Sequence, residues 1–319
     1  MVRAPATAAD LSVPSPTRAG VRYPKLQWKH VALAIYIGAN LAMTALVIRE
    51  MPTGPDWAQW QALGDALASG HLYSLETEVP YVYSPLAAPL LAALPAMGIW
   101  LFAALHVGAV LLLRHRLLII LSLTSWAFWA DVSVGNTFTF AFIAAALALR
   151  GSRTAGIVFF ALLALFPRPL EFPLALWLLW KEPRLRWPAV AVLGANALAV
   201  FASGYMTDWF SAAVSYAGST EYDIGPTKWL GHWSLVVGLP LGAWLLWSGR
   251  VGWAGLAMST YVVPQYLMLP LLDLHESRSE LLAMRSLADP GRVVARMASA
   301  GPVISRAARW TRRRRPMLS

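Results

Sequence analysis

The residue best placed to do chemistry is Asp56, which stands in the first polar stretch after an apolar run ending at Ile48. A carboxylate held at a membrane surface can take a proton from an acceptor hydroxyl and so act as a general base. Asp56 also precedes Gln59 by three residues, a spacing typical of a helix N-cap. Both roles fit the sequence, and one carboxylate can serve both.

Two further polar breaks carry candidate binding residues. The segment containing Tyr81 and Tyr83 leads back into an apolar run, and tyrosines there suit either interfacial anchoring or stacking on a sugar ring. The break from Asp131 to Asn136 contains Gly135, and Gly-Asn is typical of a turn. We therefore expect a turn with Asp131 solvated and Asn136 available to a substrate.

The later breaks add three nitrogen donors. Arg168 lies between two prolines, where a guanidinium suits a phosphate clamp, although an ion pair with Glu171 or snorkelling explains it equally well. Lys228 and His232 lie in the last long polar segment, and a lone histidine there is more typical of hydrogen-bonded structure than of a ligand site. The chain has no cysteine, no metal-ligand spacing and no nucleotide-binding loop, so we expect no cofactor and leave divalent metal use open.

The composition indicates the class of protein in which these residues lie. Of 319 residues, 58% are hydrophobic and 13% are charged, whereas a soluble domain carries about 25% charged residues. This excludes a single soluble domain and a disordered chain. The sequence predicts an all-α polytopic membrane protein.

Apolar runs separated by short polar breaks cover residues 31–272. They are Val31–Ile48, Pro85–Leu113, Leu117–Ala130, Thr137–Leu149, Thr154–Phe166, Leu170–Trp180, Trp187–Tyr205, Trp229–Trp247 and Gly252–Leu272. Pro85–Leu113 is too long for one straight crossing and contains Pro95 and Gly98, so it must be kinked or broken. We expect about 8–10 transmembrane helices.

Charge gives the expected orientation. The net charge of +10 is concentrated in the basic segment 1–30 and the arginine-rich tail 273–319. Basic residues also gather in alternate loops, which predicts a cytoplasmic N-terminus, inner-membrane location and a site on the outer face. Nine crossings would place the tail outside, so we expect the last run to be re-entrant or one run to be miscounted. A cytoplasmic tail fits anionic lipid better than nucleic acid.

The longest outer loop, residues 49–84, predicts a short helix over residues 57–69. Trp57, Trp60 and Leu63 fall on one helical face and Gln59 on another, and Gly70 ends the pattern. An amphipathic helix of this kind is expected to lie in the outer interface.

The order of these motifs resembles glycosyltransferase family 87. The resemblance covers roughly residues 31–272 and consists of short motifs in sequence order. They are the Asp56 loop, Gly70-His71-Leu72-Tyr73, Tyr81-Val82-Tyr83-Ser84-Pro85-Leu86, Gly135-Asn136, Pro167-Arg168-Pro169, His232-Trp233-Ser234-Leu235 and Pro264-Gln265-Tyr266. Phe166 stands where the family has a lysine, and the sequence shows no second acidic residue beside Asp56.

The resemblance implies a GT-C type transmembrane bundle and a polyprenyl-phosphate-sugar donor. It implies transfer of one sugar, expected to be mannose, to a lipid or glycan acceptor in a single inverting displacement. Asp56 would be the base, and Arg168 with Lys228 or His232 would stabilise the departing phosphate. Tyr81 and Tyr83 would border the sugar pocket.

Two other classes remain compatible with the sequence. A transporter or lipid flippase would use broken helices around ionisable groups deep inside its spans. The apolar runs are nearly free of such groups, with His106 the main exception, and the sequence shows no pair of matching repeats. A non-catalytic scaffold subunit would recruit partners through its arginine tail and would not need the outer carboxylates.

Overall fold

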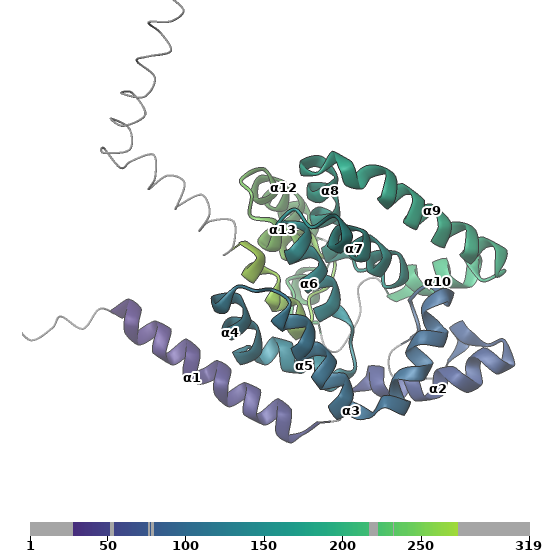
Figure 1. Cartoon of the computed structure of the whole chain (residues 1–319), viewed down its shortest axis with the longest axis horizontal. Helices are drawn as coiled ribbons and strands as arrows, with labels where there is room; N and C mark the ends of the chain where they lie inside the picture. The colour runs from purple at the N-terminus through teal and green to yellow at the C-terminus, as the bar shows by residue number, and fades with distance from the viewer. Residues whose placement is uncertain are drawn as a thin grey trace, which may run out of the picture. The chain divides into compact units, whose positions relative to one another are not determined.

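The computed structural model describes residues 28–51, 54–75, 77, 80–216, 223–231 and 233–273, and every regular element within them is helical (Figure 1). The basic N-terminal residues 1–27, the tail from residue 274 onward and His232 lie outside the described residues. The chain divides into two compact units, Met1–Ala39 and Asn40–Ser319. Apart from the first part of α1, every element below belongs to the second unit.

Most of the helices lie within the apolar runs of the sequence, whereas Pro55–Ser69 and Met206–Tyr216 lie in segments between them. In chain order they are α1 (Trp28–Arg49), α2 (Pro55–Ser69), η1 (Leu72–Ser74), η2 (Pro85–Ala87), α3 (Ala88–Leu111), α4 (Arg116–Thr124), α5 (Trp126–Val134), α6 (Phe138–Ala148), α7 (Arg153–Leu165), η3 (Pro169–Glu171), α8 (Phe172–Lys181), η4 (Pro183–Leu185), α9 (Arg186–Ala202), α10 (Met206–Tyr216), α11 (Thr227–Leu230), α12 (Trp233–Trp247), α13 (Val251–Met258) and η5 (Pro264–Met268).

Several runs are broken, some at their prolines and glycines as predicted and one without either residue. The expected break in the long run Pro85–Leu113 is confirmed, because Gly98 inside α3 has φ 70° and ψ 156°, a conformation open mainly to glycine. The run Leu117–Ala130 is also split: α4 and α5 meet at an angle of 60° across Ser125. The last run forms the short helix α13, a non-helical stretch over residues 259–263, and η5.

These breaks shorten the helices available to span a membrane. Two stretches of the described chain are long and apolar enough, Pro85–Leu111 and Pro183–Ala202, and the bent pair α4–α5 makes a third. Shorter apolar helices of 10–17 residues include Phe138–Ala148 and Arg153–Leu165. Membrane-spanning character is therefore supported for a few helices, whereas the expected count of about 8–10 crossings is not confirmed.

The predicted helix of the first outer loop is present and begins slightly earlier than expected, at Pro55. Gly70 ends it in the left-handed conformation, as predicted. Trp60 and Leu63 are buried against the protein, since α2 packs on α3. Gln59 was expected away from the apolar face but is also fully buried, so α2 is enclosed on more than one side.

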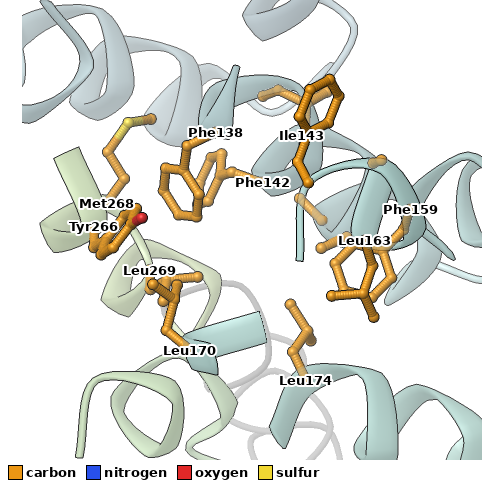
Figure 2. Packing of buried hydrophobic residues seen from close by; sticks show 14 of the residues in the cluster. Phe138, Phe142, Ile143, Phe159, Leu163, Leu170, Leu174, Tyr266, Met268 and Leu269 are labelled. Atoms are coloured by element: carbon orange, nitrogen blue, oxygen red, sulfur yellow. The ribbon is translucent and has the colours of Figure 1, made fainter. Parts of the chain in front are cut away.

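Helix α6 forms the centre of the core. Almost all of its residues are buried, and they share one hydrophobic cluster with residues of α7, α8, η3 and η5 (Figure 2). The residues that meet there are Phe138, Phe142, Ile143, Phe159, Leu163, Leu170, Leu174, Tyr266, Met268 and Leu269. The start of α6 is therefore fixed by packing, and the candidate site is built on that start.

Truncating the core should cost far more than truncating the surface. Phe142 on α6 is 1% exposed, whereas Phe201 on α9 is 72% exposed. We expect Phe142→Ala to lower the free energy of unfolding by about 3–5 kcal/mol, because it leaves a cavity, and Phe201→Ala to change it by less than about 1 kcal/mol. Thermal unfolding of the purified variants in one detergent measures the difference. Equal losses would show that α6 is not the centre of the core.

Candidate active site

Asp56 lies in the first turn of α2 and is not the residue that caps it. The N-cap position is Gly54, and no side chain caps the helix there. The N-cap interpretation of Asp56 is therefore wrong, because Pro55 occupies the first helical position and places Asp56 one residue further in. A carboxylate in a first turn still interacts favourably with the helix dipole. The side chain is 8% exposed, and its polar neighbours come from other helices.

Two glycines bring the start of α2 against the end of α5. A Cβ atom on Gly54 would lie 2.1 Å from Val134 Cα, and one on Gly135 would lie 3.0 Å from the Trp57 ring. The indole nitrogen of Trp60 donates to the Gly135 carbonyl at 2.8 Å. The sequence Gly54-Pro55-Asp56 is therefore held directly beside the turn that contains Asn136.

That turn forms the start of α6. The Asn136 side-chain oxygen accepts hydrogen bonds from the backbone N–H groups of Thr137 at 2.7 Å and Phe138 at 3.0 Å. Asp131 Oδ2 accepts from the N–H of Thr139 at 2.8 Å. Together they satisfy three of the N–H groups that a helix start leaves without intrahelical partners. Asp131 is fully buried, so the expectation that it is solvated is wrong.

Arg168 enters the same cluster from the segment between α7 and α8. Its guanidinium donates to Asn136 Oδ1 at 2.9 Å and to Thr137 Oγ1 at 3.0 Å, and it pairs with Glu171 Oε1 at 3.2 Å. The side chain is 1% exposed and lies among aromatic rings, with its central carbon 5.8–5.9 Å from the ring centres of Tyr83, Phe138 and Phe166. The predicted Arg168–Glu171 pair is thus present, and Arg168 is enclosed rather than snorkelling.

Asp56 completes this cluster. Its carboxylate makes a side-chain hydrogen bond with Asn136 and interacts electrostatically with Arg168 and Asp131. Burial raises the pKa of Asp56 to about 7, and the neighbouring Arg168 offsets part of that rise. Burial likewise raises the pKa of Glu171 to about 7, against the attraction of Arg168. A carboxyl group with a pKa near neutrality is suited to general base catalysis.

The sequence analysis paired Glu171 with Arg168 but missed Asp131 as an acid of the cluster. Asp131 acts on the pKa values of both Asp56 and Glu171, so the expectation of no second acidic residue beside Asp56 is wrong. The sequence contained a signal for this: Asp131 directly follows the apolar run Leu117–Ala130, and an acid in apolar surroundings is normally buried only with partners.

His106 lies behind the cluster, on α3. Its Nε2 atom is 3.1 Å from the Asn136 carbonyl oxygen and 3.6 Å from Asp131 Oδ2, and its Nδ1 atom is 2.9 Å from the Phe102 carbonyl oxygen. The ring is fully buried. His106 therefore connects α3 to the turn that positions Asn136.

The two predicted tyrosines have different places. Tyr83 is partly exposed, and its ring packs against Phe166 with ring centres 5.4 Å apart. Tyr81 is 1% exposed, and its hydroxyl donates to the Ser84 carbonyl at 2.7 Å. It therefore stabilises the chain between Tyr81 and Ser84 rather than facing the guanidinium of Arg168. On the other side of the cluster, Tyr266 from η5 packs on Phe138 with ring centres 4.9 Å apart.

Of the remaining predicted donors, the structure describes only Lys228, which is not part of the buried cluster. Lys228 is exposed on α11, and His232 lies outside the described residues. Asp223, from the same region, is buried and accepts from the N–H groups of Gly225 at 2.7 Å and Val262 at 2.8 Å. That segment is therefore joined to residues 261–263 by Asp223.

Three buried atoms of the cluster have no hydrogen-bond partner among the described residues: Arg168 Nε, Asp131 Oδ1 and Glu171 Oε2. Unsatisfied buried polar atoms in one place are uncommon and are typical of functional sites. Within the described residues, no group of three or more histidine, aspartate and glutamate side chains is arranged to hold a metal ion. The arrangement offers a base, a cation and an aromatic wall.

No family model, curated protein or solved structure matches the chain. The interpretation of the site therefore depends on its own geometry.

The close approach of α2 to α5 should be sensitive to one methyl group. We expect Gly54→Ala to displace the start of α2, lower the melting temperature and move Asp56 away from Asn136, because its Cβ atom would overlap Val134. Gly64→Ala is the matched control, since a Cβ atom there meets nothing within 4 Å. That change should stabilise α2 by about 0.5–1 kcal/mol. Comparable stability of the two variants would contradict the contact.

The raised pKa of Asp56 predicts how stability depends on pH. Folding disfavours the charged form, so the wild-type chain loses stability as the pH rises from about 4, where an unfolded aspartate ionises, to about 7. Asp56→Asn removes this loss. We expect the melting temperature of Asp56→Asn minus that of wild type to increase between pH 5 and pH 8. A difference that does not change over this range would show that Asp56 ionises normally.

Proposed function

We propose that the protein is a membrane glycosyltransferase that moves one sugar from a polyprenyl-phosphate donor to a lipid or glycan acceptor at the outer face. The observation that carries the proposal is the buried cluster of Asp56, Asn136 and Arg168, in which a carboxyl group of raised pKa lies beside a guanidinium. Mannose is the expected sugar, on the motif resemblance to glycosyltransferase family 87.

A single displacement at the anomeric carbon of the donor sugar gives each residue of the cluster a role. Asp56 takes the proton of the acceptor hydroxyl, whose oxygen forms a bond to the anomeric carbon while the bond from that carbon to the phosphate oxygen breaks. The leaving group is the polyprenyl phosphate, and the configuration inverts. Asn136 holds the carboxylate of Asp56 through their hydrogen bond.

Arg168 is the group suited to the departing phosphate. A guanidinium recognises phosphate oxygens through several N–H groups, and a buried one acts in surroundings of low dielectric constant. Its Nε atom has no partner within the described residues, whereas the terminal nitrogens are held by Glu171, Asn136 and Thr137. Tyr83, partly exposed beside the guanidinium, offers a ring face to a sugar.

The surface of the chain supports a membrane location. Large apolar side chains are exposed along α9 and α12, among them Trp187 at 82%, Phe201 at 72%, Trp233 at 78% and Trp247 at 80%. Apolar surfaces of this extent mark contact with lipid or protein. A multi-pass inner-membrane protein with a cytoplasmic N-terminus is part of the same proposal. Polyprenyl-phosphate donors suit it because they are dissolved in the bilayer.

One observation favours a second candidate, a transporter or lipid flippase. Asp131 and His106 form a buried pair inside apolar helices, and α3 and the α4–α5 pair are both broken close by. Broken helices around buried ionisable groups are typical of transporters. This candidate requires the same buried charges but no acceptor chemistry.

A transfer assay tests the proposed function. Purified protein in lipid vesicles receives radiolabelled polyprenyl-phosphate mannose and a pool of lipid and glycan acceptors. We expect Asp56→Asn to lower transfer at least about 100-fold. Wild-type kcat/KM should rise with pH along a limb near pH 7, because the base must be ionised and the pKa of Asp56 is about 7.

Asp65→Asn is the matched control, since Asp65 is an exposed aspartate on the same helix. It should leave transfer unchanged. Full activity of Asp56→Asn would remove Asp56 from the mechanism. Vesicles that scramble labelled lipid across the bilayer but transfer no sugar would favour the flippase.

A further inference from the structure

A second feature, separate from the Asp56 cluster, is an apolar groove between α3, α6 and α7. It has a volume of about 340 Å³ and opens to the surface. Nearly all of its lining is aliphatic or aromatic, including Leu112, Phe140, Leu147, Val158 and Leu162, and its polar lining residues are Ser152 and Thr154. A groove of this size is within the usual range for small-molecule sites.

One end of the groove carries four arginines. Arg114 follows the last turn of α3, Arg116 begins α4, Arg150 follows α6, and Arg153 begins α7 between two lining residues. Arg114, Arg116 and Arg153 are exposed. Arg150 instead donates to the Leu113 carbonyl, which ties the end of α6 to the end of α3. The groove is therefore apolar along its length and positively charged at one end.

An apolar groove with a basic end suits a molecule that has an apolar chain and an anionic headgroup. We propose that the groove binds an acyl chain of an anionic phospholipid, with the lipid phosphate at Arg114, Arg116 and Arg153. Apolar burial favours the chain, and the arginines favour a negatively charged headgroup over a neutral one. The same arginines lie in the loops assigned to the cytoplasm by the positive-inside rule, which places the lipid in the inner leaflet.

The bound lipid would contact a residue that packs against the candidate site. Phe140 lines the groove, and its ring centre is 4.4 Å from that of His106, which in turn contacts the Asn136 carbonyl. This inference depends on the membrane location proposed above but not on the transferase reaction. Loss of the lipid and loss of sugar transfer are separate measurements.

The experiment is native mass spectrometry of the protein purified from membranes and exchanged into equal amounts of phosphatidylglycerol and phosphatidylcholine. We expect wild type to retain phosphatidylglycerol several-fold more than phosphatidylcholine. Val158→Trp, which fills the groove from an exposed position, should abolish retention of both lipids. The double variant Arg116→Gln with Arg153→Gln should retain the two lipids equally.

The matched controls change exposed residues outside the groove. Leu176→Trp on α8 and Arg184→Gln in η4 should behave as wild type. Retention unchanged by Val158→Trp, or no headgroup preference in wild type, would overturn the proposal. A dimer that Val158→Trp dissociates would also overturn it, because the occupant would then be a second copy of the chain. Absence of the protein from the membrane fraction would instead contradict the membrane location.

Discussion

The structure of the site depends on the burial of one guanidinium. Arg168 is 1% exposed, and moving a charge of this size out of water costs several kcal/mol unless it is paired and hydrogen-bonded. Its partners come from two parts of the chain, with Glu171 in its own segment and Asn136 and Thr137 at the start of α6. Satisfying Arg168 therefore fixes how the α7–α8 connection meets α6.

Asn136 connects the buried Arg168 to the rest of the site. Its side-chain oxygen is used by Arg168 and by two backbone N–H groups, so the orientation of the amide is determined. The amide nitrogen is then the part left to face Asp56, which α2 brings in through the contact between Gly54 and Val134. A single side chain thus connects the proposed base with the proposed phosphate-binding group.

Much of this arrangement could be predicted from local sequence. The apolar runs located the helices, Gly98 with Pro95 predicted the break in α3, and Gly70 predicted the end of α2. Asp56, Asn136 and Arg168 were recognised because each is a polar residue at a break between apolar runs. These features depend on backbone conformation and hydrophobicity over a few neighbouring residues.

The features that the sequence did not predict depend on contacts between distant segments. Asp131 was expected in solvent because it lies at a polar break of the sequence, yet it is fully buried beside His106 and the N–H of Thr139. Lys228 has a charge suited to phosphate but is exposed on α11, outside the buried cluster. Whether a polar residue at a helix end faces water or other helices is decided by tertiary packing, and a single sequence contains little information about it.

The order of these contacts along the chain has a consequence for biogenesis. All hydrogen bonds described for Arg168 are made among residues 136–171, and Asp131, which lies in α5 just before this stretch, accepts from the N–H of Thr139 within it. Tyr266, which packs on Phe138, is synthesised nearly a hundred residues later than Arg168. Because proteins fold from the N-terminus during synthesis, the buried arginine finds its partners before the later helices emerge from the ribosome. The cluster around Arg168 can therefore assemble early, and the segment that contains Tyr266 packs over it later.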